Sequence, residues 1–380
     1  MRSKGFVFII ILLILLPITA SPVKGLEIEN NRPVILLDSH TGEILYENNI
    51  DKKLPPASIT KIMTSLLAME AIEAGELSLD DQVTVSSAAS GMGGSQIYLA
   101  SGDSLKVREL LKAIIIASAN DASYALAEKI GGDYDAFIDM MNERAQELGM
   151  ENTNFANATG LPDSDHYSTA RDISKMSREL VKYQEVLDWG QTWLKYLDLP
   201  DRQAMLTNTN HLAFNYTGMD GLKTGYTREA GFNLSATAKR DGMRLISVVL
   251  GAENQQERQR LTTKLLDYGF DHYRQEKIFA KGDTLEGIFI PESKKQSVQG
   301  LLAENLKIIL PRAEEVELTT AISLDNELEF PILAEEKIGE VVVKERDEIR
   351  QRADIIAAED IERAGIFRRL FRWFRNLLPF

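Results

Sequence analysis

A serine and a lysine three residues apart, Ser58 and Lys61, are the first pair in this sequence whose types and spacing could do chemistry. They follow Pro55-Pro56, and proline is excluded from helix interiors but tolerated at a helix start. Apolar residues then recur at helical spacing, which places Ser58 in the first turn of a helix with Lys61 on the same face. A hydroxyl and an amine held together there make a candidate nucleophile and base. The pair alone proves little, because a serine near a helix start is also a common capping residue.

Two further motifs follow this pair along the chain. Ser118-Ala119-Asn120 ends an apolar run and opens a second helical pattern, and Lys223-Thr224-Gly225 precedes two alternating runs that predict strands. Ser-x-x-Lys, Ser-x-Asn and Lys-Thr-Gly in this order are the signature of penicillin-interacting serine enzymes. The sequences of residues 157–162, 166–172 and 220–225 closely resemble those of the low-molecular-mass penicillin-binding proteins of the 5/6 type, which act as D-alanyl-D-alanine carboxypeptidases. The resemblance runs from about residue 27 to the C-terminus and is weakest after residue 280.

The resemblance implies an acyl-enzyme on Ser58. No histidine lies in any motif at a suitable place, so Lys61 is the available base, provided that it is neutral. Burial and repulsion from Lys223 would both lower its pKa. By resemblance, Ser118 relays a proton to the leaving group, and Asn120 orients the substrate amide and Lys61.

The same resemblance assigns the third motif to substrate binding. Lys223 and Thr224 would hold the terminal carboxylate of the substrate, and Gly225 would let the strand approach it closely. The oxyanion would lie between the backbone N–H groups of Ser58 and Tyr226. We expect these residues to need no cofactor and no metal ion.

The elements that must position these motifs predict a mixed α/β fold. Residues 33–38 and 43–47 predict one hairpin, and residues 231–238 and 244–250 predict another around an Asp-Gly turn. Helical patterns cover residues 107–149, 168–199 and 254–268. Strands from both ends of a helical block suggest one antiparallel sheet covered by helices. The resemblance implies the serine β-lactamase/transpeptidase-like arrangement, whereas the residue pattern alone predicts only the mixed class.

Composition limits the classes of function. The chain has 380 residues with 44% apolar content, enough for more than one core. Its formal net charge of −14 argues against nucleic acid as a partner. The absence of cysteine excludes disulfides and thiolate metal sites.

Residues 1–25 resemble a secretory signal peptide. Arg2 and Lys4 precede a continuous apolar stretch, residues 6–16, which is shorter than the ~20 residues that a membrane-spanning helix needs. Cleavage after Ala20 and cleavage after Gly25 both remain open, and an uncleaved anchor is the alternative.

The remainder divides into a catalytic domain at 26–277, a small β-rich domain at 278–350, and a linker with an amphipathic helix at 351–380. Wound as a helix, residues 366–380 separate aromatic and leucine side chains from four arginines, a pattern typical of a helix lying in a membrane interface. A helix docked on the protein itself is the alternative. We expect an exported enzyme at the outer face of the cytoplasmic membrane, held peripherally by this helix.

The predicted function is removal of the terminal D-alanine from peptidoglycan stem peptides, with β-lactam antibiotics as inhibitors. Two alternatives stay open. A secreted β-lactamase would share the motifs, but residues 151–155 show no obvious match to the deacylating glutamate loop of one such class. A non-enzymatic penicillin-binding sensor would usually carry a transmembrane span.

Overall fold

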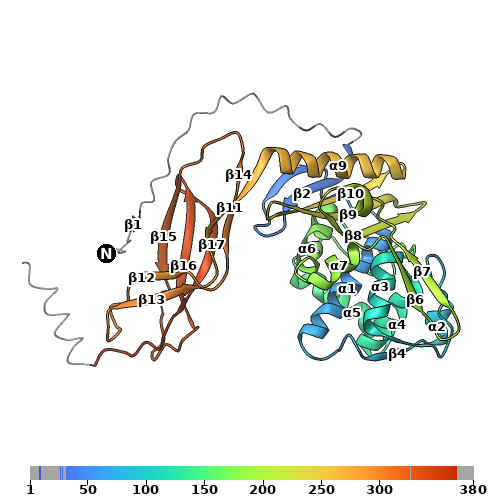
Figure 1. Cartoon of the computed structure of the whole chain (residues 1–380), viewed down its shortest axis with the longest axis horizontal. Coiled ribbons are helices and arrows are strands. Elements are labelled where there is room, and N and C mark those ends of the chain that lie inside the picture. The colour runs from blue at the N-terminus through green and yellow to red at the C-terminus, as the bar shows by residue number, and fades with distance from the viewer. Residues whose placement is uncertain (1–7, 10–25, 27, 29–30, 326, 366–380) are drawn as a thin grey trace, which may run out of the picture. The chain divides into compact units, whose positions relative to one another are not determined.

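The structure is a computed structural model that describes residues 8–9, 26, 28, 31–325 and 327–365. The chain divides into two compact units, the first formed by residues 23–272 and the second by the residues from Tyr273 onward together with residues 1–22 (Figure 1). Within the predicted signal peptide only the two-residue strand β1 (Phe8–Ile9) is described, and it pairs with β15 (Leu318–Leu324). Cleavage of this segment stays a prediction.

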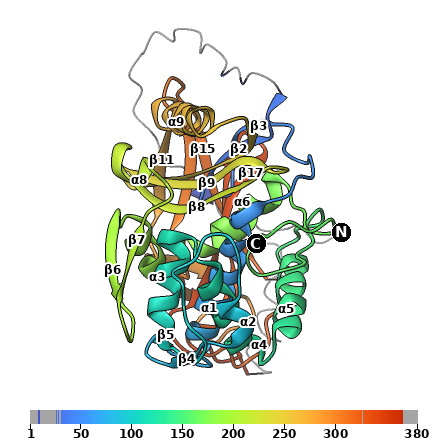
Figure 2. The same cartoon turned by 90° about the vertical axis from the view of Figure 1, so that its right-hand side faces the viewer.

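The first unit is built on a five-stranded antiparallel sheet in the order β3-β2-β10-β9-β8. Both predicted hairpins are present, and strands from the two ends of the unit lie side by side as the pattern indicated. Helix α9 packs on one face of the sheet and α6 on the other (Figures 1 and 2). Strand β8 is at the edge of the sheet, so one side of it is open to a ligand strand. The strands and these helices are β2 (Val34–Asp38), β3 (Ile44–Asn48), β8 (Met219–Thr227), β9 (Gly231–Arg240), β10 (Met243–Ala252), α6 (Ala170–Leu180) and α9 (Gln255–His272).

The remaining helices of the first unit form an apolar core beneath the sheet. Their buried side chains are mainly leucine, isoleucine, methionine and alanine, as expected for helices enclosed on several sides. The elements are the 3₁₀ turn η2 (Ala57–Thr60), α1 (Lys61–Glu73), β4 (Gln82–Thr84), α2 (Ser87–Ser90), β5 (Ser104–Lys106), α3 (Val107–Ala117), α4 (Asn120–Gly131), α5 (Tyr134–Glu147), α7 (Gln184–Gly190) and α8 (Leu212–Asn215).

The prediction of helices throughout residues 168–199 is wrong at its end. Helix α7 stops at Gly190, and the chain continues into a hairpin of β6 (Leu194–Asp198) and β7 (Gln203–Thr207). In β7 the side chains alternate between exposed and buried, and Ala204 and Leu206 face the core. This two-residue period is spread over two short strands, so the neighbouring helical pattern concealed it.

The second unit is β-rich, as predicted, with an apolar core of its own. Its main sheet has the order β1-β15-β16-β17-β13-β12, and β11 pairs with β14. The strands not yet bounded are β11 (Tyr273–Phe279), β12 (Thr284–Phe289), β13 (Ser297–Leu302), β14 (Leu306–Pro311), β16 (Lys337–Glu345) and β17 (Glu348–Ala357).

The two predicted boundaries of this unit fall inside strands. The division at 277/278 cuts β11, and the division at 350/351 cuts β17. The second unit continues past β17, because Ile361 pairs with Ile332 and Ala364 donates its backbone N–H to Glu292. A linker from residue 351 is therefore wrong. The amphipathic helix predicted at 366–380 lies outside the described residues.

Across the described ranges, no helix is both long enough and apolar enough to span a bilayer.

Candidate active site

Ser58 and Lys61 meet at the N-terminal end of α1. Ser58 lies in the η2 turn and Lys61 is the first residue of the α-helix, so the predicted helical spacing is confirmed with a tighter first turn. Lys61 Nζ is 3.2 Å from Ser58 Oγ. The residue before the serine, Ala57, has a φ of +51°, in the left-handed region that alanine rarely adopts. The backbone is thus bent sharply where it presents the serine hydroxyl.

The amine nitrogen of Lys61 is enclosed by two further oxygen atoms. Its Nζ donates to Asn120 Oδ1 at 2.5 Å and to the Thr159 backbone carbonyl at 2.6 Å. The residue is fully buried, with 0% exposure. Burial and, second, the nearby charge of Lys223 lower the pKa of Lys61 well below its usual value, while Asp121 acts in the opposite direction. Lys61 therefore has the geometry and the electrostatics of a base rather than of a fixed cation.

Ser118 and Asn120 occupy the junction between α3 and α4, as predicted. Ser118 caps α3 in the left-handed conformation, with φ 64° and ψ 30°, and it is buried. Asn120 begins α4, and its Nδ2 donates to the Gly93 carbonyl at 2.6 Å. At Gly94 a Cβ atom would lie 2.8 Å from that same Nδ2, so glycine is needed there. The glycine-rich loop therefore holds the amide of Asn120 with its oxygen toward Lys61.

Lys223, Thr224 and Gly225 lie on the edge strand β8. A Cβ at Gly225 would come within 2.7 Å of the Pro56 carbonyl, so only glycine lets this strand pack against the turn that carries Ser58. Thr224 Oγ1 donates to Thr209 Oγ1 at 2.7 Å.

The buried amine of Lys223 brings a second cation close to Lys61. Both lysines line one small cavity of about 10 Å³, together with Ser65 and apolar side chains. Burial and, second, the charge of Arg258 lower the pKa of Lys223 to about 7. Lys223 is thus poised to gain a full charge when an anion binds beside it.

Arg258 and Asn233 support the site but were not predicted. Arg258 lies on α9, is buried, and donates from Nη1 to the Asn233 carbonyl at 3.4 Å. Asn233 Nδ2 donates to the carbonyl groups of Pro55 and Pro56, both at 3.1 Å. No local pattern could have singled out either residue, because one sits among charged residues of an amphipathic helix and the other inside a strand.

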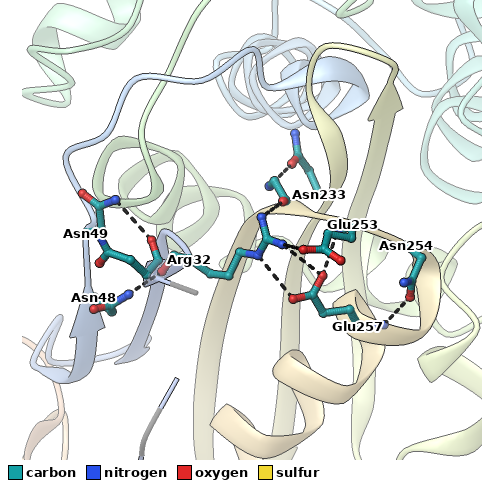
Figure 3. A network of polar contacts seen from close by, with 9 residues as sticks. Arg32, Asn48, Asn49, Asn233, Glu253, Asn254 and Glu257 are labelled. Carbon is teal, nitrogen blue, oxygen red and sulfur yellow. Dashed lines mark hydrogen bonds and ion pairs between the residues drawn. The ribbon is translucent and has the colours of Figure 1, made fainter. Parts of the chain in front are cut away.

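Figure 3 shows how Asn233 is itself held. Its Oδ1 accepts the backbone N–H of Gly251 at 2.8 Å, and Arg32 Nη1 donates to the carbonyl of the same glycine at 2.7 Å. Arg32 also pairs with Glu253 at 2.5 Å and with Glu257 at 3.2 Å. The chain leading into β2, the end of β10 and the start of α9 are thereby joined behind the residues that precede Ser58.

The loop formed by residues 154–169 closes the site from the other side. His166 Nδ1 accepts the backbone N–H of Ala156 at 3.0 Å, so Nε2 carries the proton and donates to Thr60 Oγ1 at 2.6 Å. Burial lowers the pKa of His166 to about 4, which keeps the ring neutral. At Gly160, with φ +81°, a Cβ would lie 1.9 Å from the Ala57 carbonyl and 2.8 Å from the Ser58 nitrogen. This glycine therefore lets the loop close on the backbone of the serine.

The two groups predicted for the oxyanion lie on these same elements. Ser58 contributes its backbone N–H from η2, and Tyr226 follows Gly225 on β8. The Tyr226 side chain is exposed and lies against Phe232, with ring centroids 4.4 Å apart. Strand β8 therefore fixes the backbone amide of Tyr226, and the side chain is not needed at the oxyanion site.

A mixed α/β domain in which these three motifs meet around Lys61, followed by a β-rich domain, defines the class of penicillin-interacting serine peptidases. Residues 19–254 match the Peptidase S11 family, described as D-alanyl-D-alanine carboxypeptidase. Residues 273–363 match the C-terminal domain of penicillin-binding protein 5. The chain belongs to this family and is a serine D-Ala-D-Ala carboxypeptidase of the penicillin-binding protein 5 type.

Individual relatives agree with this assignment. D-alanyl-D-alanine carboxypeptidase DacF of Bacillus subtilis (strain 168) is 39% identical over 88% of this chain and 86% of its own length. The crystal structure of penicillin-binding protein 5 from Haemophilus influenzae has a TM-score of 0.76 and 30% identity, and covers 90% of this chain and 99% of that one. Penicillin-binding protein D2 from Listeria monocytogenes, solved in a cefotaxime-bound form, has a TM-score of 0.59 and 34% identity, and covers 65% of this chain and 100% of that one.

Proposed function

We propose that Ser58 is the nucleophile of the carboxypeptidase reaction and that neutral Lys61 is its base. The observation that carries this assignment is the fully buried Lys61 Nζ at 3.2 Å from Ser58 Oγ, close to a second buried cation. Ser58 Oγ bonds to the carbonyl carbon of the last peptide bond, and its proton passes to Lys61 Nζ. The terminal D-alanine then leaves as an amine that receives a proton through Ser118. Water subsequently hydrolyses the ester on Ser58.

The same proposal gives the third motif to the substrate carboxylate. Lys223 and Thr224 bind it, and the carboxylate in turn raises the pKa of Lys223 from its low value in the free enzyme. Asn120 holds the substrate amide, and Gly225 lets β8 pack against the turn that carries Ser58, which keeps this strand close to the substrate. The backbone N–H groups of Ser58 and Tyr226 stabilise the oxyanion, a type of contact worth about 10²–10³-fold in rate.

The proposal extends to β-lactam antibiotics at the same site. A β-lactam presents a carbonyl and a carboxylate in the relation found in the terminal dipeptide, so Ser58 would open the ring and remain acylated. The cefotaxime-bound form of the Listeria monocytogenes relative supports this extension.

Replacement of Ser58 tests the assignment. The Ser58→Ala variant should fold normally, give no covalent mass shift with penicillin, and release no D-alanine from a D-Ala-D-Ala peptide. Ser87→Ala, at an exposed serine that begins α2, is the matched control and should still be labelled. A Ser58→Ala protein that still forms a covalent adduct would remove this residue from the mechanism.

We also propose that the enzyme works at the outer face of the cytoplasmic membrane, held by residues 366–380. The support is the sequence alone: an export signal at residues 1–25 and a C-terminal segment that separates bulky apolar side chains from Arg368, Arg369, Arg372 and Arg375. Each arginine should contribute about 1 kcal/mol of binding to anionic lipid, a contribution that weakens with salt.

Shortening the chain tests this location. A protein ending at Gly365 keeps every described contact of the second unit, including the bond between Ala364 and Glu292. It should turn over a small peptide like the full chain but should no longer pellet with anionic vesicles. Equal pelleting of the two proteins would assign the anchoring to another part of the chain.

A further inference from the structure

Asp121 is a buried carboxylate that the mechanism proposed above does not use. It follows Asn120 in the first turn of α4 and has 0% exposure. Within the described ranges it forms no ion pair, although burial of an unpaired charge is costly. The start of a helix favours a negative charge, but this alone does not require that the carboxylate be enclosed. The reason for its burial must therefore lie in its hydrogen bonds and in its charge.

The carboxylate of Asp121 organises the loop formed by residues 91–99. Its Oδ1 accepts the backbone N–H of Ala122 at 2.9 Å, and its Oδ2 accepts that of Leu99 at 3.0 Å. The backbone N–H of Ile97 lies between the two oxygens, at 3.3 and 3.2 Å. All of these donors are N–H groups, which suit an ionised carboxylate because it can only accept. Asp121 thus joins the second half of the loop to the start of α4.

The first half of the same loop holds Asn120. The backbone N–H of Asn120 donates to the Ser95 carbonyl at 2.7 Å, and its Nδ2 donates to the Gly93 carbonyl at 2.6 Å. Its Oδ1 accepts from Lys61 Nζ at 2.5 Å. Two successive residues of α4 therefore clamp one loop. The position of the asparagine oxygen at Lys61 depends on both halves of that loop.

Tyr98, between the two amides that Asp121 accepts, has a strained backbone. Its φ of +61° lies in the left-handed region that tyrosine rarely adopts, and its side chain is 72% exposed. From the turn between β6 and β7, Arg202 donates to the carbonyl groups of Ile97 and Tyr98. Such a conformation persists only where the surrounding structure enforces it. Asp121 on the amide side and Arg202 on the carbonyl side supply that enforcement.

The charge of Asp121 also acts on Lys61. Burial and the charge of Lys223 on β8 lower the pKa of Lys61, whereas Asp121 on α4 acts in the opposite direction. His166, in the loop on the other side of the site, has a pKa of about 4 and stays neutral. Asp121 therefore opposes the effect of Lys223 on the amine of Lys61.

We propose that Asp121 is a positioning residue for the reaction. It fixes the 91–99 loop so that Asn120 presents its oxygen to Lys61, and its negative charge balances that of Lys223 at the same amine. It acts through Asn120 and the loop, and it contacts neither Ser58 nor the substrate. The inference rests on the function proposed above, in which Lys61 is the base.

The Asp121→Asn variant of the full chain tests this role, because it removes the charge and keeps the size of the side chain. Loss of a nearby negative charge favours the neutral amine of Lys61, so the rising limb of kcat/KM against pH should move to lower pH by about 0.5–1 unit. The maximum of the profile should fall by ~10-fold, because Asn120 is held less firmly. The measurement is turnover of a D-Ala-D-Ala peptide over the full pH range.

Two further variants separate the charge from the hydrogen bonds. Asp121→Glu keeps the charge but displaces the carboxylate by one methylene, so it should lower kcat/KM and leave the rising limb close to its wild-type pH. Asp103→Asn is the matched control. The carboxylate of Asp103 is exposed and accepts the backbone N–H of Ala100 at 2.8 Å, just after the same loop. This control should change neither the limb nor the maximum.

Two results with a folded Asp121→Asn protein would overturn the proposal. One is a loss of kcat/KM at every pH with the rising limb unmoved, since that would mean a structural role alone. The other is a wild-type profile. If Asp121→Asn does not fold, the same profile is measured for Asp121→Asn combined with Tyr98→Gly, because glycine adopts the left-handed conformation freely and the loop then needs less support.

Failure of the proposed function would give a different result. The wild-type profile would then have no rising limb, or Lys61→Arg would be labelled by penicillin at the normal rate, and both assignments would fall together. A wild-type rising limb that is lost in no variant but moves in Asp121→Asn alone supports the positioning role.

Discussion

The two units of this chain bury very different kinds of side chain. The first unit buries Lys61, Lys223 and Arg258, together with several carboxylates, amides and hydroxyls. In the described part of the second unit, Ser293 is the only fully buried polar side chain, and its hydroxyl donates to the Ile290 carbonyl at 2.8 Å. Burial of a charge costs stability unless the charge is paired.

This difference indicates that the first unit carries the catalytic residues. Burial lowers the pKa values of all three cations of the first unit, and those of Lys61 and Lys223 suit the base and the anion-binding group proposed above. The second unit buries mainly isoleucine, leucine and valine side chains, and strand β13 shows the alternation of exposed and buried residues expected over such a core. Substitutions in the first unit should therefore lower the activity by more than their effect on stability explains. Substitutions in the second unit should lower stability only.

The largest effect is expected at Lys61. Lys61→Arg keeps a positive charge at all accessible pH values, so it should lower the rate of acylation by about 10²–10⁴-fold while the protein stays folded. The measurement is the rate of covalent labelling by penicillin, with Lys182→Arg as the matched control, because Lys182 is an exposed lysine paired with Glu179. Near-normal acylation in Lys61→Arg would refute the base assignment.

A pH profile should reveal both lysines. Lys61 must be neutral, so kcat/KM should rise with pH through its lowered pKa; Lys223 must be charged, so kcat/KM should fall above about pH 7. Bound substrate carboxylate raises the pKa of Lys223, so the falling limb of kcat should lie at higher pH than that of kcat/KM. A falling limb at the same pH in both profiles would contradict carboxylate binding by Lys223.

The lowered pKa of Lys223 should also make the stability of the first unit depend on pH. Lys223 has a folded-state pKa of about 7, below its usual value of 10.5, so the unfolded chain binds more protons between these values. The free energy of unfolding should therefore increase as pH rises from about 7 toward 10.5. The Lys223→Met variant should lack this contribution in thermal unfolding, and an unchanged pH dependence would show that Lys223 is not the group responsible.

The motif residues were predictable because each motif is contiguous in sequence. Ser58 and Lys61 span the end of η2 and the start of α1, Ser118 and Asn120 span the junction of α3 and α4, and the Lys223 triplet lies on β8. The structure brings these three short stretches together around Lys61. The hairpins of the central sheet were predictable for the same local reason.

The supporting residues were not predictable, since their roles come from tertiary contacts. Thr159 reaches Lys61 through its backbone carbonyl, which carries no residue-type signal. Asn233 donates to the carbonyl groups of Pro55 and Pro56 across the fold, and Arg258 is the buried charged residue of a helix whose other charged residues are exposed or half-buried. Pairing across the second sheet likewise decided that β17 continues past residue 350.

A matched pair of core changes compares the two units directly. Asn233→Ala leaves two carbonyl groups and the Gly251 N–H without their partner, at a cost of about 1–3 kcal/mol in stability. Ile355→Val in the second unit should cost about 0.5–1.5 kcal/mol. Only Asn233→Ala should also lower kcat/KM, by ~10–10²-fold, because it displaces the turn that carries Ser58. Equal kcat/KM in the two variants, with the expected loss of stability in both, would show that Asn233 contributes to stability and not to the position of Ser58.

The smallest effect is expected from removing the second unit altogether. Every side chain described in the candidate active site, from Arg32 to Arg258, lies inside the first unit. The solved chain of the Listeria monocytogenes relative is matched over its whole length by 65% of this chain, which supports a catalytic unit that folds without a second domain. A protein ending at His272 should therefore keep its rate of labelling by penicillin and its kcat/KM for a short peptide within about twofold of the full chain, as expected when no catalytic or substrate-binding group is lost. Circular dichroism shows whether the shortened protein is folded. A folded protein with low activity would show that the second unit acts on the site. A folded protein with normal activity would show that the first unit is sufficient for the chemistry.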